Sequence, residues 1–166
     1  MADATTTRQP VMIAPPVPPV DYYPLQQAHS ARKMYAQHLC AYVLAARQLL
    51  GKPAAGVRVL DAGCGRGYGA AFLSDYGIAS VTGVDLLLDQ AAEAQRRFGR
   101  PGVAFLGGDL LQLGLRSGSF DVACSFQVIE HIPVDRQVAY LREIARVLRP
   151  EGVFVVSTLN RAVNMK

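Results

Sequence analysis

Hydrophobic and polar positions along the chain follow two alternating periods. Short apolar runs rich in β-branched residues predict strands, and between them apolar residues recur at the three- and four-residue spacing of a helix. The expected strands lie near 57–61, 80–85, 103–107, 120–125 and 152–157. The expected helices lie near 67–76, 88–99 and 134–148, after a longer amphipathic helix from Ser30 to Leu50. This order predicts an α/β fold: a doubly wound parallel sheet of about five strands with helices on both faces.

The first part of the chain has a different composition. Residues 1–24 contain six of the ten prolines, including the run APPVPPV. Such a segment favours an extended conformation that packs little against a core. We therefore expect a flexible proline-rich leader over 1–28 and one folded domain over 29–166.

Composition and charge exclude several function classes. The chain has 166 residues, 51% of them hydrophobic, which suffices for one buried core. A net charge of +4 could indicate an anionic partner, but the basic residues are scattered among acids and nucleic acid is not expected. We expect no membrane contact, because no apolar stretch approaches the roughly 20 residues of a membrane span. Cys40, Cys64 and Cys124 match no disulfide or metal-ligand spacing, so we expect a cytoplasmic protein without a metal.

A glycine-rich turn follows the first expected strand. The sequence VRVLDAGCGRGYG places Asp61, Gly63, Gly65 and Gly67 at alternate positions. Glycines here allow positive φ angles and a close approach of the backbone to a ligand, next to the N-terminus of a helix. A dinucleotide-binding turn would need its third glycine at Tyr68, so the spacing disfavours a nicotinamide-dependent oxidoreductase, which remains one alternative.

Polar residues also follow the next three strands, where ligands of such sheets bind. Asp85 follows the second strand and suits a ribose diol, because a carboxylate has two acceptor oxygens, although this alone does not separate the possible cofactors. Asp109 follows the third strand and suits the exocyclic amine of adenine; the alternative is a helix N-cap. Ser125, Phe126 and Gln127 end the fourth strand.

Taken together, residues Val57 to Arg161 resemble the UbiE/Methyltransf_11-like group of class I S-adenosylmethionine (SAM)-dependent methyltransferases. The matching segments are VLDAGCGRGYG, VTGVDLLLDQAAEAQRRF, GGDLLQLGLRSGSFDVACSFQVIEHI and LREIARVLRPEGVFVVSTLNR. The resemblance implies contacts to methionine from Asp61, Gly63, Cys64 and Gly65, to ribose from Asp85 and Leu86, to adenine from Asp109 and Leu110, and near the sulfonium from the Gln127 backbone. It further implies SAM as cofactor and S-adenosylhomocysteine as product.

The expected reaction transfers a methyl group to a small-molecule or glycan-type acceptor. A sulfonium methyl is already activated, so a general base matters only for an acceptor whose proton has a high pKa. Glu130 and His131 are the local candidates, with His131 able to titrate near neutrality. The helix containing Tyr35, His38 and Tyr42 resembles a lid over the cofactor; half-buried packing is the alternative for the two tyrosines.

The resemblance breaks after the fifth strand. Complete members of the family continue through another helix and two further strands, so we expect a truncated fold with an apolar edge from Gly152 to Ser157. An edge-strand dimer or a partner chain could cover that edge. The alternative function is therefore a non-catalytic SAM-binding or pseudo-methyltransferase module that requires a partner.

Overall fold

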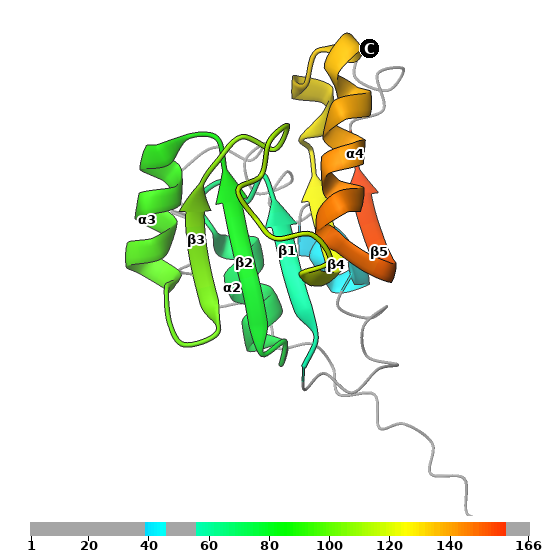
Figure 1. Ribbon diagram of the computed structural model, residues 1–166. Helices are drawn as coiled ribbons and strands as arrows, with labels where there is room; N and C mark the ends of the chain where they lie inside the picture. Colours follow the sequence, from blue (N-terminus) through cyan, green and yellow to red (C-terminus); the bar gives the residue numbers. More distant parts are fainter. Residues whose placement is uncertain (1–38, 46–55, 159–166) are drawn as a thin grey trace, which may run out of the picture.

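The computed structural model describes residues 39–45 and 56–158. Its centre is a parallel sheet of five strands, β1 Arg58–Ala62, β2 Ser80–Asp85, β3 Val103–Gly107, β4 Phe120–Phe126 and β5 Leu148–Ser157. The strands lie side by side in the order β3-β2-β1-β4-β5, with all carboxyl ends at the top of Figure 1. The expected α/β class and doubly wound parallel sheet are confirmed. The proposed leader over 1–28, together with Tyr35 and His38, lies outside the described residues.

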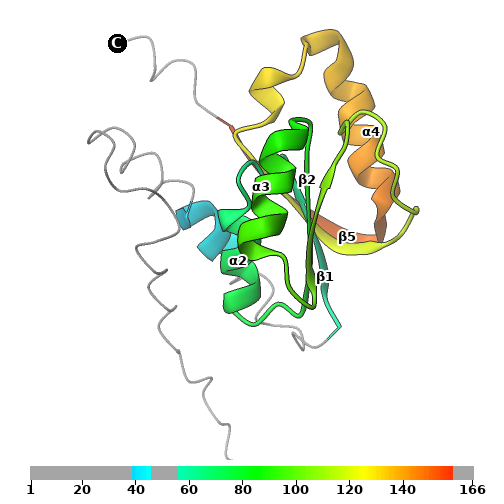
Figure 2. The ribbon, with the colours of Figure 1, turned by 90° about the vertical axis from the view of Figure 1, so that its left-hand side faces the viewer.

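Helices cover both faces of the sheet (Figure 2). One face is covered by helical residues 39–45, by α2 Tyr68–Asp75 and by α3 Leu88–Phe98. The other face is covered by α4 Gln137–Val147, which follows two 3-10 turns, η2 Ile129–His131 and η3 Val134–Arg136. The expected helix near 134–148 is therefore shorter and begins with a 3-10 turn.

The core has two layers, one on each face of the sheet. In β1, Val59 belongs to the cluster under α2, whereas its neighbour Leu60 belongs to the cluster under α4, and both are fully buried. Successive side chains of a strand point to opposite faces, so a sheet covered on both sides needs continuous apolar strands. On the α4 side, Tyr140 and Ile144 lie one helical turn apart and are both buried. This packing fixes the carboxyl ends of the strands relative to one another.

The fifth strand begins earlier than the sequence pattern predicts. Leu148 already pairs with Phe120, and pairing resumes at Val153, opposite Val122, after an irregularity. Within the irregularity Glu151 has a φ of 65°, an uncommon value for a residue with a side chain. Proline is tolerated in bulges and edge strands because it lacks an N–H, so Pro150 interrupts the ladder without ending the strand. The strand expected over 152–157 is therefore confirmed, but its start lies at Leu148.

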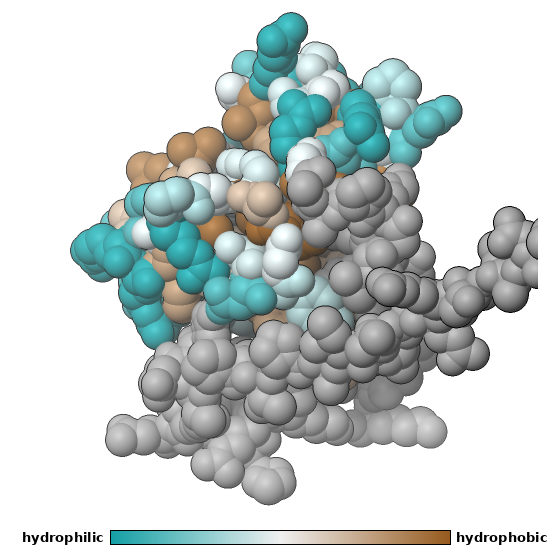
Figure 3. All heavy atoms as spheres, turned by 90° about the horizontal axis from the view of Figure 1, so that it is seen from below, coloured by the Kyte–Doolittle hydropathy of each residue, from teal (hydrophilic) through white to brown (hydrophobic). Residues whose placement is uncertain are grey.

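The amino-terminal end of the sheet, opposite the carboxyl ends, is rich in charge. Figure 3 looks at this end and shows hydrophilic residues along its left edge, on the side of α3. Asp121, near the start of β4, is 6% exposed, accepts a hydrogen bond from the Arg58 backbone N–H (2.7 Å) and pairs with Arg149. A buried carboxylate of this kind needs such partners to offset its desolvation. These ion pairs compensate the buried charge of Asp121, at the end of the sheet opposite the glycine turn.

Candidate functional site

The glycine turn is tied to the neighbouring strand by its backbone. The N–H groups of Gly63 and Cys64 both donate to the carbonyl oxygen of Val84, at 2.8 and 3.0 Å. Gly63 has a φ of 84°, and a Cβ there would collide with the side chain of Val128. Gly67 has a φ of 81° and is the N-cap residue of α2; a Cβ there would lie 2.6 Å from Ala94 and from Phe105. Both positions therefore require glycine, for conformation and for space.

Asp85 closes the turn from the end of β2. Its Oδ2 accepts a hydrogen bond from the backbone N–H of Gly65 (2.7 Å), and its Oδ1 accepts one from Leu87 (2.9 Å). Each carboxylate oxygen has two acceptor positions, so one position on each oxygen remains for a ligand. The two backbone bonds orient the carboxylate, which is partly exposed, toward the space above the sheet. This arrangement suits a vicinal diol.

Asp109 lies on the segment that connects β3 to β4. Its Oδ1 accepts a hydrogen bond from the backbone N–H of Leu111 (2.8 Å), which closes a local Asx turn. No helix follows within this described segment, so the turn is not a helix cap. Asp109 is exposed and Leu110 is buried, 8% exposed. The carboxylate therefore faces outward beside an apolar side chain.

The side chain of Arg146 on α4 holds the segment that connects β3 to β4. Its guanidinium donates to the carbonyl oxygens of Leu113 and Leu115, both at 2.9 Å, and to the hydroxyl of Ser117 at 3.0 Å. It also forms two bonds of 2.7 Å to the carboxylate of Glu143, one turn earlier. This pairing holds the pKa of Glu143 below its usual range. One side chain thus replaces the internal bonds that a helix would give this segment.

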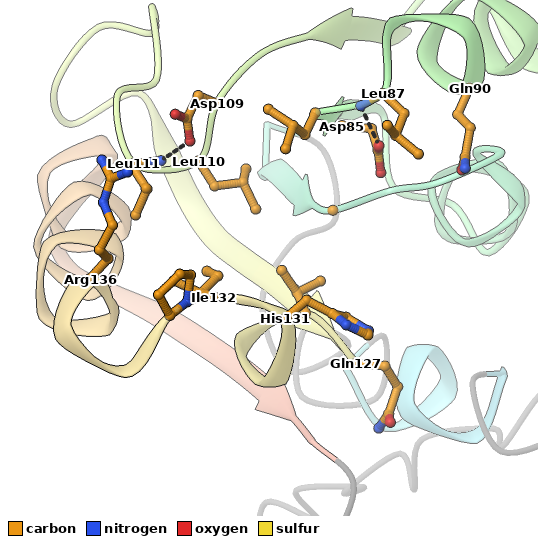
Figure 4. A pocket seen from close by; sticks show the side chains of 14 residues that line it. Asp85, Leu87, Gln90, Asp109, Leu110, Leu111, Gln127, His131, Ile132 and Arg136 are labelled. Atoms are coloured by element: carbon orange, nitrogen blue, oxygen red, sulfur yellow. Dashed lines mark hydrogen bonds between the residues drawn. The ribbon is translucent and has the colours of Figure 1, made fainter.

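A pocket of about 620 Å³ opens at the carboxyl ends of the strands (Figure 4). Its wall includes six of the nine residues that the sequence assigned to the cofactor: Gly63, Asp85, Leu86, Asp109, Leu110 and Gln127. It also includes His131 and seven residues that the sequence analysis missed: Leu87, Gln90, Leu111, Val128, Ile132, Pro133 and Arg136. Most of these lie on connecting segments whose course hydrophobic periodicity does not give. Gln90 could have been found, because it lies in the first turn of the helix that follows Asp85.

Gln127 and His131 form the pocket wall after β4. Gln127 has a φ of 59°, and its backbone N–H donates to the carbonyl oxygen of Ser157 on β5 (2.9 Å). The His131 side chain is exposed and projects toward Gln127 in Figure 4. Glu130 accepts a hydrogen bond from the Thr158 hydroxyl (3.0 Å) and is not among the wall residues. Catalysis by His131 stays a prediction.

Asp61 and Cys64 lie behind the pocket wall. Asp61 is 1% exposed, and the hydroxyl of Tyr42 lies 3.0 and 3.1 Å from its two carboxylate oxygens. Burial raises the pKa of Asp61 to about 7, although the Tyr42 hydrogen bond acts in the opposite direction. Tyr42 therefore packs inside the fold instead of closing over the pocket. Burial also raises the pKa of the Cys64 and Cys124 thiols.

Two features of other site classes are absent from the part of the chain that the structure describes. Over 39–45 and 56–158, no helix is long and apolar enough to cross a membrane. In these ranges no group of three or more His, Cys, Asp or Glu side chains is placed to bind a metal ion. The polar side chains of the pocket wall are two carboxylates, two amides, an imidazole and a guanidinium.

Comparison with known proteins identifies the family. Residues 60–156 match the methyltransferase domain family Methyltransf_11. A Mycolicibacterium smegmatis protein named "Probable S-adenosylmethionine-dependent methyltransferase" is 46% identical over 69% of this chain and 42% of its own length. The ubiquinone biosynthesis O-methyltransferase of Albidiferax ferrireducens is 33% identical over 86% of this chain and 52% of its own length. The chain thus spans about half the length of these two relatives.

A solved structure agrees with the fold. The magnesium protoporphyrin IX methyltransferase of Synechocystis PCC 6803, crystallised with bound S-adenosylhomocysteine, superposes with a TM-score of 0.66 at 25% identity. The superposition covers 76% of this chain and 59% of that one. The chain therefore belongs to the methyltransferase domain family, and its resemblance to the class I SAM-dependent methyltransferases is confirmed.

Proposed function

We propose that the protein is a SAM-dependent methyltransferase and that the pocket at the carboxyl ends of β1, β2 and β3 binds SAM. The observation that supports this most directly is the pair of acids on the wall, Asp85 and Asp109, on either side of an apolar floor that includes Leu110. SAM has a ribose diol and an adenine amine as hydrogen-bond donors, with an apolar ring face between them. The order of polar and apolar groups in the wall is complementary to that molecule.

The residues present fit the cofactor on physical grounds. Asp85 keeps one free acceptor position on each oxygen, enough for both hydroxyls of a ribose. Oδ1 of Asp109 accepts a backbone bond, which leaves Oδ2 for the adenine amine. The missing side chain of Gly63 leaves the backbone at the wall open to a ligand. Leu86, which is 66% exposed at the rim, would gain burial against the bound nucleoside.

Bound SAM supplies a methyl group on a sulfonium, which transfers by in-line displacement. The protein's contribution is then to orient the two reactants and exclude water. Val128, Ile132 and Pro133 give the wall after β4 an apolar character suited to that exclusion. If the acceptor is an alcohol or phenol, His131 is placed on the wall to accept its proton.

The names of the relatives support a small molecule as the methyl acceptor. One relative is named for ubiquinone biosynthesis, and methylation of a glycan-type acceptor is the narrower alternative from the sequence. A cytoplasmic location stays a prediction that rests on cysteine usage. Pairing along β5, the edge strand of the described sheet, also stays a prediction.

A thermal-shift titration tests the cofactor assignment. Ligands that bind only the folded state raise its apparent melting temperature, by an amount that grows with concentration. We expect SAM and S-adenosylhomocysteine to raise it, NAD to leave it unchanged, and Asp85→Ala to abolish the effect of the first two. Glu93→Ala is the matched control and should bind normally, because Glu93 pairs with Arg97 on α3 and is not among the wall residues. A shift with NAD alone, or an unchanged SAM shift in Asp85→Ala, would contradict the proposal.

A further inference from the structure

Gln137, the first residue of α4, holds the part of the pocket wall that follows β4. Its side-chain amide donates to the carbonyl oxygen of Ile129 (3.1 Å) and to that of Ile132 (3.2 Å). Ile129 is the first residue of η2, and Ile132 directly follows its last one. A single amide group therefore spans the 3-10 turn from end to end and ties it to α4.

The turn that Gln137 spans contributes three residues to the pocket wall. They are His131, the last residue of η2, and the two residues that follow it, Ile132 and Pro133 (Figure 4). Within the part of the chain that the structure describes, the His131 side chain forms no hydrogen bond or ion pair. The direction of its ring is therefore set by the backbone of the turn, and a 3-10 turn has weaker internal hydrogen bonds than an α-helix.

Apolar contacts hold the same segment against the sheet. A Cβ on Gly63 would lie 2.4 Å from the Val128 side chain, so Val128 packs directly on the glycine turn. Ile129 and Ile132 pack against the apolar cluster under α4. Apolar packing is not directional, whereas a hydrogen bond fixes the positions of both partners. The two bonds from Gln137 are therefore what determines how the turn is rotated and where its wall residues point.

We propose that Gln137 is a positioning residue for methyl transfer: its two hydrogen bonds hold His131, Ile132 and Pro133 in place as the wall that the methyl acceptor meets. The inference rests on the proposed function, because methyl transfer requires a wall that orients the acceptor and excludes water. Gln137 itself is not among the wall residues. Its loss should therefore disturb this part of the wall and change the affinity for SAM only slightly.

The experiment compares the wild-type chain with Gln137→Met by NMR and calorimetry. Methionine has nearly the length of glutamine and no donor. In the wild type we expect one narrow ring signal for His131 that shifts when SAM is added, because the ring lies in the wall of the same pocket; His131→Gln assigns this signal among the three histidines. In Gln137→Met the signal should broaden or split, and hydrogen exchange of the Ile132 N–H should accelerate by about tenfold or more, since two hydrogen bonds are lost. Calorimetry should give nearly the same SAM affinity for both proteins.

Arg142→Met is the matched control. It also replaces a long polar side chain of α4 by methionine, but Arg142 is exposed and makes no hydrogen bond within the described structure. We expect the His131 signal and the Ile132 exchange rate of this variant to equal those of the wild type.

A second variant, Gln137→Glu, tests the donor itself and covers the case in which Gln137→Met does not fold. Glutamate has the shape of glutamine; its ionised form has no donor for the two carbonyl oxygens, and its protonated form regains one. The acceleration of Ile132 exchange, relative to the wild type at the same pH, should therefore be large at pH 7 and smaller at pH 4. A side chain that only fills space would not produce this difference.

The outcomes separate the inference from the proposed function. The inference is overturned, and the proposed function stands, if SAM binds but the wild-type His131 signal does not respond to it, or if folded Gln137→Met behaves like the wild type. An effect of Gln137→Glu that is equal at both pH values, or unfolding of both Gln137 variants beside a folded Arg142→Met, overturns the inference in the same way. A wild-type chain that binds no SAM overturns the proposed function and the inference together.

Discussion

Replacing Arg146 by alanine should loosen the segment that contains Asp109. The guanidinium makes three bonds of 2.9–3.0 Å to Leu113, Leu115 and Ser117. A hydrogen bond from a charged group contributes about 1.5–3 kcal/mol when buried, but the Arg146 side chain is 36% exposed and water can replace part of it. We take about 0.7 kcal/mol for each bond. Removing all three should therefore lower the free energy of unfolding by about 2 kcal/mol.

The assay is urea denaturation followed by circular dichroism, with SAM affinity measured on the same samples. Arg146→Lys keeps the charge but lacks the planar fork, so it should lose about half as much stability. Arg142→Ala is the control, because Arg142 is exposed on the same helix and makes no hydrogen bond within the described structure. The difference should shrink in acid, where Glu143 becomes protonated and its bonds to Arg146 weaken. Equal stabilities for Arg146→Ala and Arg142→Ala would refute the reasoning.

Three further changes test the core behind the pocket. Gly69→Ala should destabilise the protein by about 1–3 kcal/mol in urea denaturation, although alanine normally favours a helix, because the new methyl group collides with the Tyr42 ring; a gain in stability would contradict this packing. Asp61→Asn should raise the melting temperature at pH 8 and leave it unchanged near pH 4. The reason is that burial raises the pKa of the Asp61 carboxyl from 3.8 to about 7. The ionised carboxylate therefore opposes folding by up to about 4 kcal/mol above pH 7, and the protonated one does not below pH 4. Parallel curves of melting temperature against pH for the wild type and Asp61→Asn would show that Asp61 does not titrate in this range. The buried thiols of Cys64 and Cys124 should react with a disulfide reagent only on unfolding, since their pKa values are raised, whereas the exposed Cys40 reacts in the native protein; rapid labelling of more than this one thiol per native chain would count against their burial.

The sequence predicted the fold well wherever one period dominates. β1 and β2 are short apolar runs between glycines and acids, and a parallel sheet buried on both faces leaves few other ways to place them. The start of β5 was missed because pairing depends on the neighbouring strand. Leu148 joins the sheet only because Phe120 is available opposite it, and local sequence does not contain that information.

Part of the candidate site could also be predicted from the sequence, and part could not. Asp85 and Asp109 could be predicted, because the carboxyl ends of parallel strands must meet at one edge of the sheet. The hydrogen bonds that hold these two side chains in position could not be predicted. The Gly65 bond to Asp85 and the Arg146 bonds to the 113–117 segment join residues 20 to 33 positions apart, across turns whose path periodicity does not define.

The strand order has a consequence for how the protein reaches its native state. The chain first builds outward from β1 through β2 to β3, then returns across β1 to add β4 and β5 on the other side. Pairing β1 with β4 joins residues more than 60 positions apart, a non-local contact of the kind that slows folding. Because the pocket wall takes Asp85 from the first half and Val128 from the second, it exists only after both halves have docked. Ligand binding in this protein therefore reports completion of the sheet, and a nascent chain that ends before β4 has no site to fill.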